Sequence, residues 1–144
     1  MPKIYYRGER FTGHSPSLDE RPEVVFRPHR KNRPVTVQTV IEHIISGTEE
    51  TPFVSVTLSK SIAERYATED GVVWALQLSA ALQIINPVSV INTWLVENPN
   101  ADQEFRSRAE EAIMLASNDH ELLIVGGVPS RCIDFSRTYY CKKR

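Results

Sequence analysis

Residues 118–129 read NDHELLIVGGVP, and this stretch decides how the rest of the sequence is interpreted. Two carboxylates, Asp119 and Glu121, lead into an apolar run of strand length that stops at a Gly-Gly pair and a proline. On a strand or its lead-in, period-two alternation places both carboxylates on one face and His120 on the other. A carboxylate pair at the mouth of a buried strand is costly to keep charged unless a ligand or a basic partner uses it. The stretch is therefore the first candidate site.

Length and composition predict one globular domain spanning residues 1–144. The chain is 41% hydrophobic and 24% charged, which is enough for a single domain that buries a full core. Its net charge of -1 argues against a protein that coats nucleic acid or membrane by bulk charge, and leaves a local basic patch open. Cys132 and Cys141 lack metal-ligand spacing, so we expect free thiols in a reducing compartment, with a single disulfide left open.

The N-terminal sequence predicts where the protein acts. Residues 1–7 read MPKIYYR and contain no apolar core of signal-peptide length, and no stretch of the chain is long enough to span a bilayer. We therefore expect a cytoplasmic site of action and no membrane partner, whether the protein is made there or delivered by something other than a cleaved signal.

The N-terminal third is predicted to hold a strand, a long loop and a helix. The short β-prone run at 4–6 predicts a strand with Arg7 at its end. Residues 9–34 predict a long loop with a basic run at 27–33, which is either a functional flap or partner-binding arm or an ordinary solvated loop. Apolar spacing over 35–46 predicts a helix, with His43 on the flank of its stripe.

The middle of the chain alternates predicted strands and helices. Residues 52–58 predict a strand with the hydroxyls of Ser55 and Thr57 on one face and hydrocarbon on the other, as in a strand that lines a polar cleft. Ser61 and Glu64 have capping-box spacing for the next helix. Residues 72–78 are apolar on both faces, which is typical of a central buried strand.

The C-terminal half is predicted to be mixed as well. Residues 84–97 are apolar and ambiguous, with a turn at 86–87, and the stripe over 105–116 predicts a helix that leads into the 118–129 stretch. Residues 132–135 and 139–140 predict one or two last strands, and 142–144 a frayed tail. The fold class is therefore α+β, with strands outnumbering helices.

Three short motifs now occur in a recognisable order. The pair YR at 6–7, the run FVSVT at 53–57 with a following helix that carries Ala63, and DHEL at 119–122 ahead of GGVP resemble the arginine, serine-threonine-serine and glutamate motifs of mono-ADP-ribosyltransferase toxins. Among these toxins, the closest likeness is to the catalytic subunit of cholera toxin and heat-labile enterotoxin. The resemblance covers most of the chain and implies a split β-sheet core with flanking helices in a single compact domain.

The resemblance implies an enzyme that transfers ADP-ribose from NAD+ and needs no metal. Glu121 would stabilise an oxocarbenium-like transition state and hold the ribose 2′-hydroxyl, and Arg7 would bind the dinucleotide phosphates. Ser55 would hydrogen-bond Glu121 or the ribose, and Thr57 would support the same side of the NAD+ cleft.

Three further residues are placed at the NAD+ site by the resemblance alone. Tyr6 and Gly8 flank Arg7 and are expected beside it. His43 would contact the ribose, although a histidine on a helix flank, taken by itself, indicates only a boundary position.

Two positions depart from the motif pattern. Val56 replaces the middle hydroxyl and is expected to face the core. Asp119 stands where arginine-modifying members carry glutamate and where nucleobase-modifying members usually carry glutamine. That carboxylate would orient the acceptor, so the sequence leaves the acceptor open between protein arginine and nucleic acid.

Alternative functions remain open at this stage. Taken singly, Arg7 could be a surface ion-pair residue, Ser55 an edge-strand hydroxyl and Glu121 a solvated strand-end charge; the ordered set of three favours a site. An NAD+ glycohydrolase, with water as the acceptor, is the main alternative, and a catalytically idle module that binds NAD+ or nucleic acid is a second. An antitoxin or immunity protein is a possible partner of such a toxin or effector.

Overall fold

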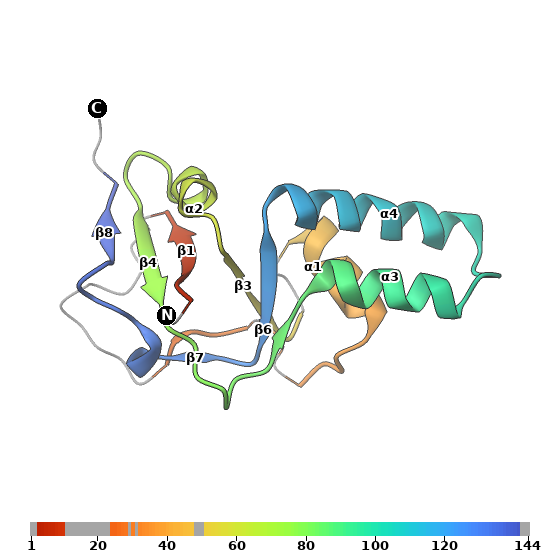
Figure 1. The fold of residues 1–144 in the computed structure, drawn as a ribbon, viewed down its shortest axis with the longest axis horizontal. Coiled ribbons are helices and arrows are strands. Elements are labelled where there is room, and N and C mark those ends of the chain that lie inside the picture. Colours follow the sequence, from red (N-terminus) through yellow and green to blue (C-terminus); the bar gives the residue numbers. More distant parts are fainter. Residues whose placement is uncertain (1–2, 11–23, 29, 31, 48–50, 142–144) are drawn as a thin grey trace.

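A central antiparallel sheet organises the chain. The computed structural model describes residues 3–10, 24–28, 30, 32–47 and 51–141. Within them, six strands pair in the order β5-β6-β3-β1-β4-β8 (Figure 1). In sequence order these strands are β1 (Tyr5–Glu9), β3 (Phe53–Thr57), β4 (Val72–Leu76), β5 (Ile84–Ile85), β6 (Glu121–Val125) and β8 (Tyr139–Tyr140).

The two halves of this sheet meet at a narrow junction. Strands β3 and β6 share five register pairs, and so do β1 and β4, whereas β1 and β3 share only the pair Tyr6↔Thr57. Continuing that register would set Gly8 opposite Ser55, but the ladder does not extend so far. The split sheet expected from the sequence thus takes the form of a continuous sheet whose halves are joined at one pair.

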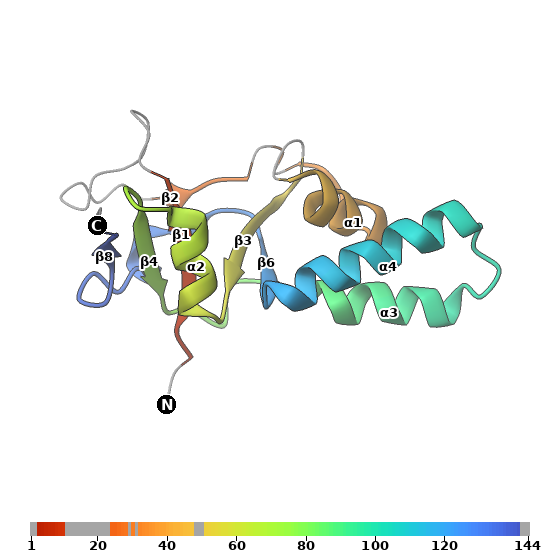
Figure 2. The same ribbon diagram turned by 90° about the horizontal axis from the view of Figure 1, so that it is seen from above.

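A layer of three helices covers one half of the sheet. These helices are α1 (Val37–Ser46), α3 (Pro87–Glu97) and α4 (Gln103–Asn118). Helices α3 and α4 lie side by side and extend beyond the sheet, with α1 beside them (Figures 1 and 2). Side chains from all three helices form one hydrophobic cluster with Phe53 of β3 and Leu123 of β6. This packing fixes α1 and the end of α4 against the same two strands.

The opposite face of the sheet carries a second hydrophobic cluster. Trp74 of β4 is its largest buried side chain and meets the ring of Phe26 edge-on, with ring centroids 5.6 Å apart. Phe26 belongs to β2 (Val24–Phe26), which pairs with β7 (Val128–Pro129) as a separate two-stranded sheet. A 3-10 turn, Ser130–Cys132, then leads the chain back toward β4.

Helix α2 (Lys60–Ala67) lies directly against β1 and β4. Its small residues Ala63 and Ala67 are fully buried there. A Cβ atom on Gly8 would lie 1.8 Å from the carbonyl oxygen of Ala63 and 2.9 Å from the amide nitrogen of Ala67. Only a glycine in β1 therefore permits this close approach.

Replacing Gly8 with alanine is expected to destabilise the fold. The new methyl group would collide with helix backbone, which can be relieved only by moving α2 away from the sheet. Overpacking of this kind costs about 1–3 kcal/mol of unfolding free energy, and this contact is at the severe end. Urea denaturation of wild type and Gly8→Ala measures the difference; a loss smaller than about 0.5 kcal/mol would show that α2 is not held as described.

Several predicted elements are corrected in the N-terminal half. Arg7 lies in the middle of β1 rather than at its end, because the strand continues as far as the edge of β4 supplies partners. The predicted loop 9–34 contains β2; its residues 11–23, and residues 29 and 31 of the basic run, lie outside the described part. Helix α2 begins at Lys60, capped by Ser59 and not by Ser61.

The C-terminal half needs fewer corrections. The ambiguous stretch 84–97 divides into β5 and α3, with Asn86 as the helix cap and Pro87 as the first helical residue, which is a favoured helix start. The strand predicted at 132–135 is replaced by the 3-10 turn and a single bridge from Ile133 to Leu76. Both cysteines are free, and the predicted tail at 142–144 lies outside the described residues. No helix in the described ranges is both long and apolar enough to cross a bilayer.

Candidate active site

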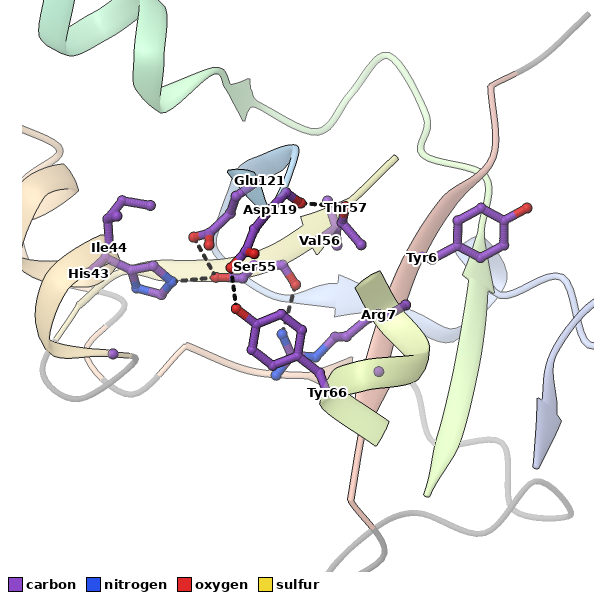
Figure 3. A pocket seen from close by; sticks show the side chains of 13 residues that line it. Tyr6, Arg7, His43, Ile44, Ser55, Val56, Thr57, Tyr66, Asp119 and Glu121 are labelled. Carbon is purple, nitrogen blue, oxygen red and sulfur yellow. Dashed lines mark hydrogen bonds between the residues drawn. The ribbon is translucent and has the colours of Figure 1, made fainter. Parts of the chain in front are cut away.

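A cavity of about 240 Å³ opens where β1, β3, α1, α2 and the start of β6 converge (Figure 3). All eight site residues predicted from the sequence line it: Tyr6, Arg7, Gly8, His43, Ser55, Thr57, Asp119 and Glu121. The structure therefore brings together residues that are up to 115 positions apart in the chain (from 6 to 121). Their assignment to an NAD+ site and their chemical roles stay predictions.

Glu121 is the central carboxylate of this cavity. It begins β6, opposite Thr57 of β3, and its Oε2 accepts a hydrogen bond from the hydroxyl of Ser55 at 3.2 Å. Burial raises the pKa of Glu121 to about 7, and the nearby charge of Asp119 acts in the same direction. The Ser55 hydrogen bond and the charge of Arg7 oppose this rise in pKa. Glu121 therefore titrates near neutral pH in the folded chain.

This pKa predicts a pH-dependent contribution to stability. Between the ordinary value of 4.5 and about 7, the folded chain binds more protons at Glu121 than the unfolded chain does. The stabilisation from this group is therefore complete below pH 4.5 and is lost as the pH rises through 7. Relative to Glu121→Gln, which does not titrate, wild type is expected to lose on the order of 1–3 kcal/mol of unfolding free energy between acidic and neutral pH. Urea titrations at about pH 5 and about pH 8 measure this difference, and a constant difference would contradict it.

A chain of hydrogen bonds runs behind Glu121. The Nε2 atom of His43 lies 2.6 Å from the hydroxyl oxygen of Ser55, and its Nδ1 atom lies 2.5 Å from that of Thr51. Because Ser55 gives its only hydroxyl proton to Glu121, Nε2 of His43 must donate to Ser55. In the neutral imidazole, Nδ1 then accepts from Thr51. The proton donors thus all point toward the carboxylate of Glu121.

The position of His43 differs from the one expected on the helix flank. His43 is only 2% exposed, and its ring packs edge-on against the ring of Phe53, with ring centroids 5.6 Å apart. The sequence held a signal for this, because His43 follows the buried residues Thr39 and Val40 by four and three positions. It therefore belongs to the inner face of α1, where its polar atoms are held by hydroxyls.

Arg7 spans the junction between the two halves of the sheet. Its Nη1 atom donates to the backbone carbonyl of Ser55 at 2.7 Å, and its Nε atom donates to Oε1 of Glu9 at 3.1 Å. The guanidinium lies over the ring of Phe26, 5.1 Å from the ring centroid. Arg7 thus links β1 to the backbone of β3 beyond the single register pair that the two strands share.

Asp119 reaches the same cavity from a turn, not from the strand. It is the C-terminal cap of α4, and the following residue, His120, has a left-handed backbone with φ of 47°. Thr57 fixes Asp119 by donating its hydroxyl to the Asp119 carbonyl at 2.7 Å. The turn, and not strand alternation, is what places Asp119 and Glu121 in one cavity.

Sequence reasoning missed the residues that hold the side chain of Asp119. The phenol of Tyr66 donates a hydrogen bond to Oδ2 of Asp119, and Arg65 lies 3.8 Å from Oδ1. Partial burial raises the pKa of the Tyr66 phenol, and its bond to Asp119 adds to the rise, so the phenol stays protonated. Tyr66 is 53 residues from Asp119 in the chain, so no local pattern could reveal the contact. Ile44 of α1 and Gly47, the C-terminal cap of that helix, also line the cavity and were not predicted.

Comparison with known proteins shows which fold this is. No protein-family model and no curated protein sequence matches the chain. Among solved structures, full-length CARDS toxin matches 92% of the chain with a TM-score of 0.63 and 14% sequence identity. EcPltA matches 96% of the chain with a TM-score of 0.58 and 16% identity.

The two matches differ in how much of the other protein they cover. The chain spans 24% of full-length CARDS toxin and 82% of EcPltA. These likenesses show that the chain shares the fold of CARDS toxin and of EcPltA. They do not support the narrower resemblance to the cholera toxin subunit.

Proposed function

We propose that this chain is a mono-ADP-ribosyltransferase of toxin type that takes ADP-ribose from NAD+ and passes it to a macromolecular acceptor. One observation carries the proposal: the partly buried Glu121 is held by Ser55 in a cavity that also contains Arg7. A carboxylate and a guanidinium in one cavity complement the two charged parts of the reaction. These are the developing cation of the ribose and the diphosphate of the dinucleotide.

In this proposal, Glu121 supplies electrostatic stabilisation. As the bond between the ribose C1′ and nicotinamide breaks, positive charge develops on the ribose ring, and a fixed carboxylate stabilises that charge without reorganising. The carboxylate must be ionised for this, so the rate of NAD+ cleavage should rise as the pH passes about 7. The donors from Ser55 and, behind it, His43 keep the carboxylate oriented.

In this proposal, Arg7 binds the phosphates of NAD+, and His43 acts indirectly, through Ser55. A guanidinium binds phosphate oxygens through a planar fork, and such charged hydrogen bonds are stronger than neutral ones. In His43, Nδ1 lies within hydrogen-bonding distance of the Thr51 hydroxyl and Nε2 within that of the Ser55 hydroxyl. We therefore assign His43 to orienting Ser55 rather than to the ribose contact implied by the family resemblance.

The test is incubation of the purified protein with NAD+ labelled on the adenine side, in the presence of cell extract and beside Glu121→Gln. Label on a macromolecule that disappears with the variant is the expected result. Release of free ADP-ribose alone would instead establish an NAD+ glycohydrolase. Intact NAD+ in every condition would overturn both, and would leave a module that binds without catalysis.

A further inference from the structure

A second, smaller cavity adjoins the one that contains Glu121. It has a volume of about 230 Å³ and is lined by Arg65, Tyr66 and Asp119. Tyr66 and Asp119 line both cavities, so their hydrogen bond forms part of a shared wall. We call the space lined by Arg65, Tyr66 and Asp119 the outer cavity. Anything bound in it would therefore lie next to the cavity that contains Glu121.

The outer cavity combines three kinds of surface. Tyr66 is 55% exposed and offers its ring to solvent. Asp119 offers a carboxylate that accepts a hydrogen bond from Tyr66, and its backbone carbonyl accepts one from Thr57. Arg65 has a side chain that is 71% exposed and lies 3.8 Å from Asp119, a distance that makes a loose surface pair. A ligand can draw Arg65 away from such a pair at little cost.

These surfaces together suit one class of acceptor better than another. A nucleotide carries a planar base that stacks on an aromatic ring, base N–H groups that donate to a carboxylate, and a phosphate that pairs with arginine. A peptide arginine would find the ring and the carboxylate, but its guanidinium would meet the like charge of Arg65 and compete with it for Asp119. The positive charge of Arg65 therefore favours a nucleotide acceptor over a peptide arginine.

We propose that the outer cavity is the acceptor subsite and that it receives a nucleotide of single-stranded nucleic acid, with its base on Tyr66, a base N–H toward Asp119 and its phosphate at Arg65. The proposal rests on the proposed function, because NAD+ supplies the ADP-ribose. Within it, Tyr66 has two roles: its ring contacts the base, and its hydroxyl positions Asp119.

The transfer step balances without a further reagent. The bond between C1′ of the ribose and the nicotinamide nitrogen breaks, and its electron pair leaves with neutral nicotinamide. A nitrogen of the base forms the new bond to C1′. The proton which that nitrogen loses passes to Asp119 and from there to solvent.

The first experiment measures binding alone and needs no NAD+. A fluorescein-labelled single-stranded DNA or RNA oligonucleotide of mixed sequence is titrated with the protein at low salt, and fluorescence anisotropy gives Kd. Tyr66→Leu is expected to weaken binding about 5- to 100-fold through lost stacking. Arg65→Ala is expected to reduce the slope of log affinity against log salt concentration by about one. Tyr140→Leu and Arg108→Ala, exposed residues of β8 and α4, serve as matched controls.

The second experiment measures transfer. Labelled NAD+ is supplied with the same oligonucleotide, and in parallel with the small guanidine agmatine. The proposal expects label on the oligonucleotide, reduced at least tenfold in Tyr66→Phe, which keeps the ring but releases Asp119. Tyr139→Phe is the matched control, because its phenol likewise bonds a carboxylate of the chain, that of Glu64, on the outer side of α2.

The outcomes separate this proposal from the proposed function. Label on agmatine with none on the oligonucleotide would overturn the nucleotide acceptor and leave a transferase that modifies guanidines. Oligonucleotide binding unaffected by both Tyr66→Leu and Arg65→Ala would overturn the subsite. If wild type consumes no NAD+, the proposed function fails, while the binding titration still tests the outer cavity.

Discussion

Glu121→Gln is expected to lower the rate of NAD+ cleavage by at least about 10²- to 10³-fold, the loss that follows removal of one preorganised electrostatic group. Glutamine has nearly the same shape, and its amide oxygen can still accept the hydrogen bond that Ser55 donates to Glu121. Only the negative charge is lost, at the point where the ribose becomes cationic. Release of nicotinamide, followed at about pH 8 where wild type is ionised, measures the effect.

The unfolding free energy of Glu121→Gln must also be measured, to show that a loss of rate does not come from an unfolded variant. Because the variant removes a carboxylate whose burial is unfavourable above neutral pH, it should be at least as stable as wild type in the same buffer. Glu104→Gln changes an exposed carboxylate in the first turn of α4 and is the matched control. Retention of more than about a tenth of the wild-type rate would remove Glu121 from the centre of the mechanism.

Arg7→Lys is the substitution with the next largest expected effect, although it conserves charge. The guanidinium holds Ser55 and Glu9 through separate nitrogens, and a lysine ammonium cannot span both and also bind a diphosphate. A charged hydrogen bond contributes about 1.5–3 kcal/mol, so kcat/KM for NAD+ should fall roughly 10- to 150-fold. A small loss of unfolding free energy should accompany it, because the Ser55 carbonyl loses its donor.

The test compares Arg7→Lys with Arg131→Lys, an exposed arginine of the 3-10 turn. Steady-state kinetics over a range of NAD+ concentrations separates the two parts of the loss. A rise in KM with little change in kcat would indicate that Arg7 binds the dinucleotide in the ground state. Activity within twofold of wild type would show that the phosphates bind elsewhere.

Local patterns were sufficient to predict the elements that carry Glu121 and Ser55. The apolar run over 122–125 and the alternation over 52–58 predicted strands, and the structure confirms both as Glu121–Val125 and Phe53–Thr57. The resemblance to a toxin family then implied that Ser55 contacts Glu121 or the ribose, which no local pattern indicates. Their side chains meet because β3 and β6 are neighbours in the sheet, with Ser55 opposite Leu123 and Thr57 opposite Glu121.

Residues whose partners are distant in sequence were predicted poorly. His43 was assigned to the flank of its helix because only apolar residues count toward a hydrophobic stripe, although a buried polar residue with partners lies on the same face. Tyr66 had no sequence signal, since an exposed helical tyrosine is ordinary until the end of α4 is placed beside it. The N-terminal cap of α2 was predicted two residues too late, at Ser61, because Ser59 and Ser61 both suit that position.

Because β1 and β3 share a single register pair, we expect the sheet to open most readily at this junction. On either side of it lie ladders of five pairs each, so we expect local opening to concentrate at Tyr6 and Thr57. A ligand that contacts Arg7 on one half and Glu121 on the other holds the two halves closed by mass action, and amide hydrogen exchange at this pair should slow when it binds. In the backbone of the sheet, the width of the site is thus set by a single rung, and the Arg7 side chain reinforces that rung from β1 to β3.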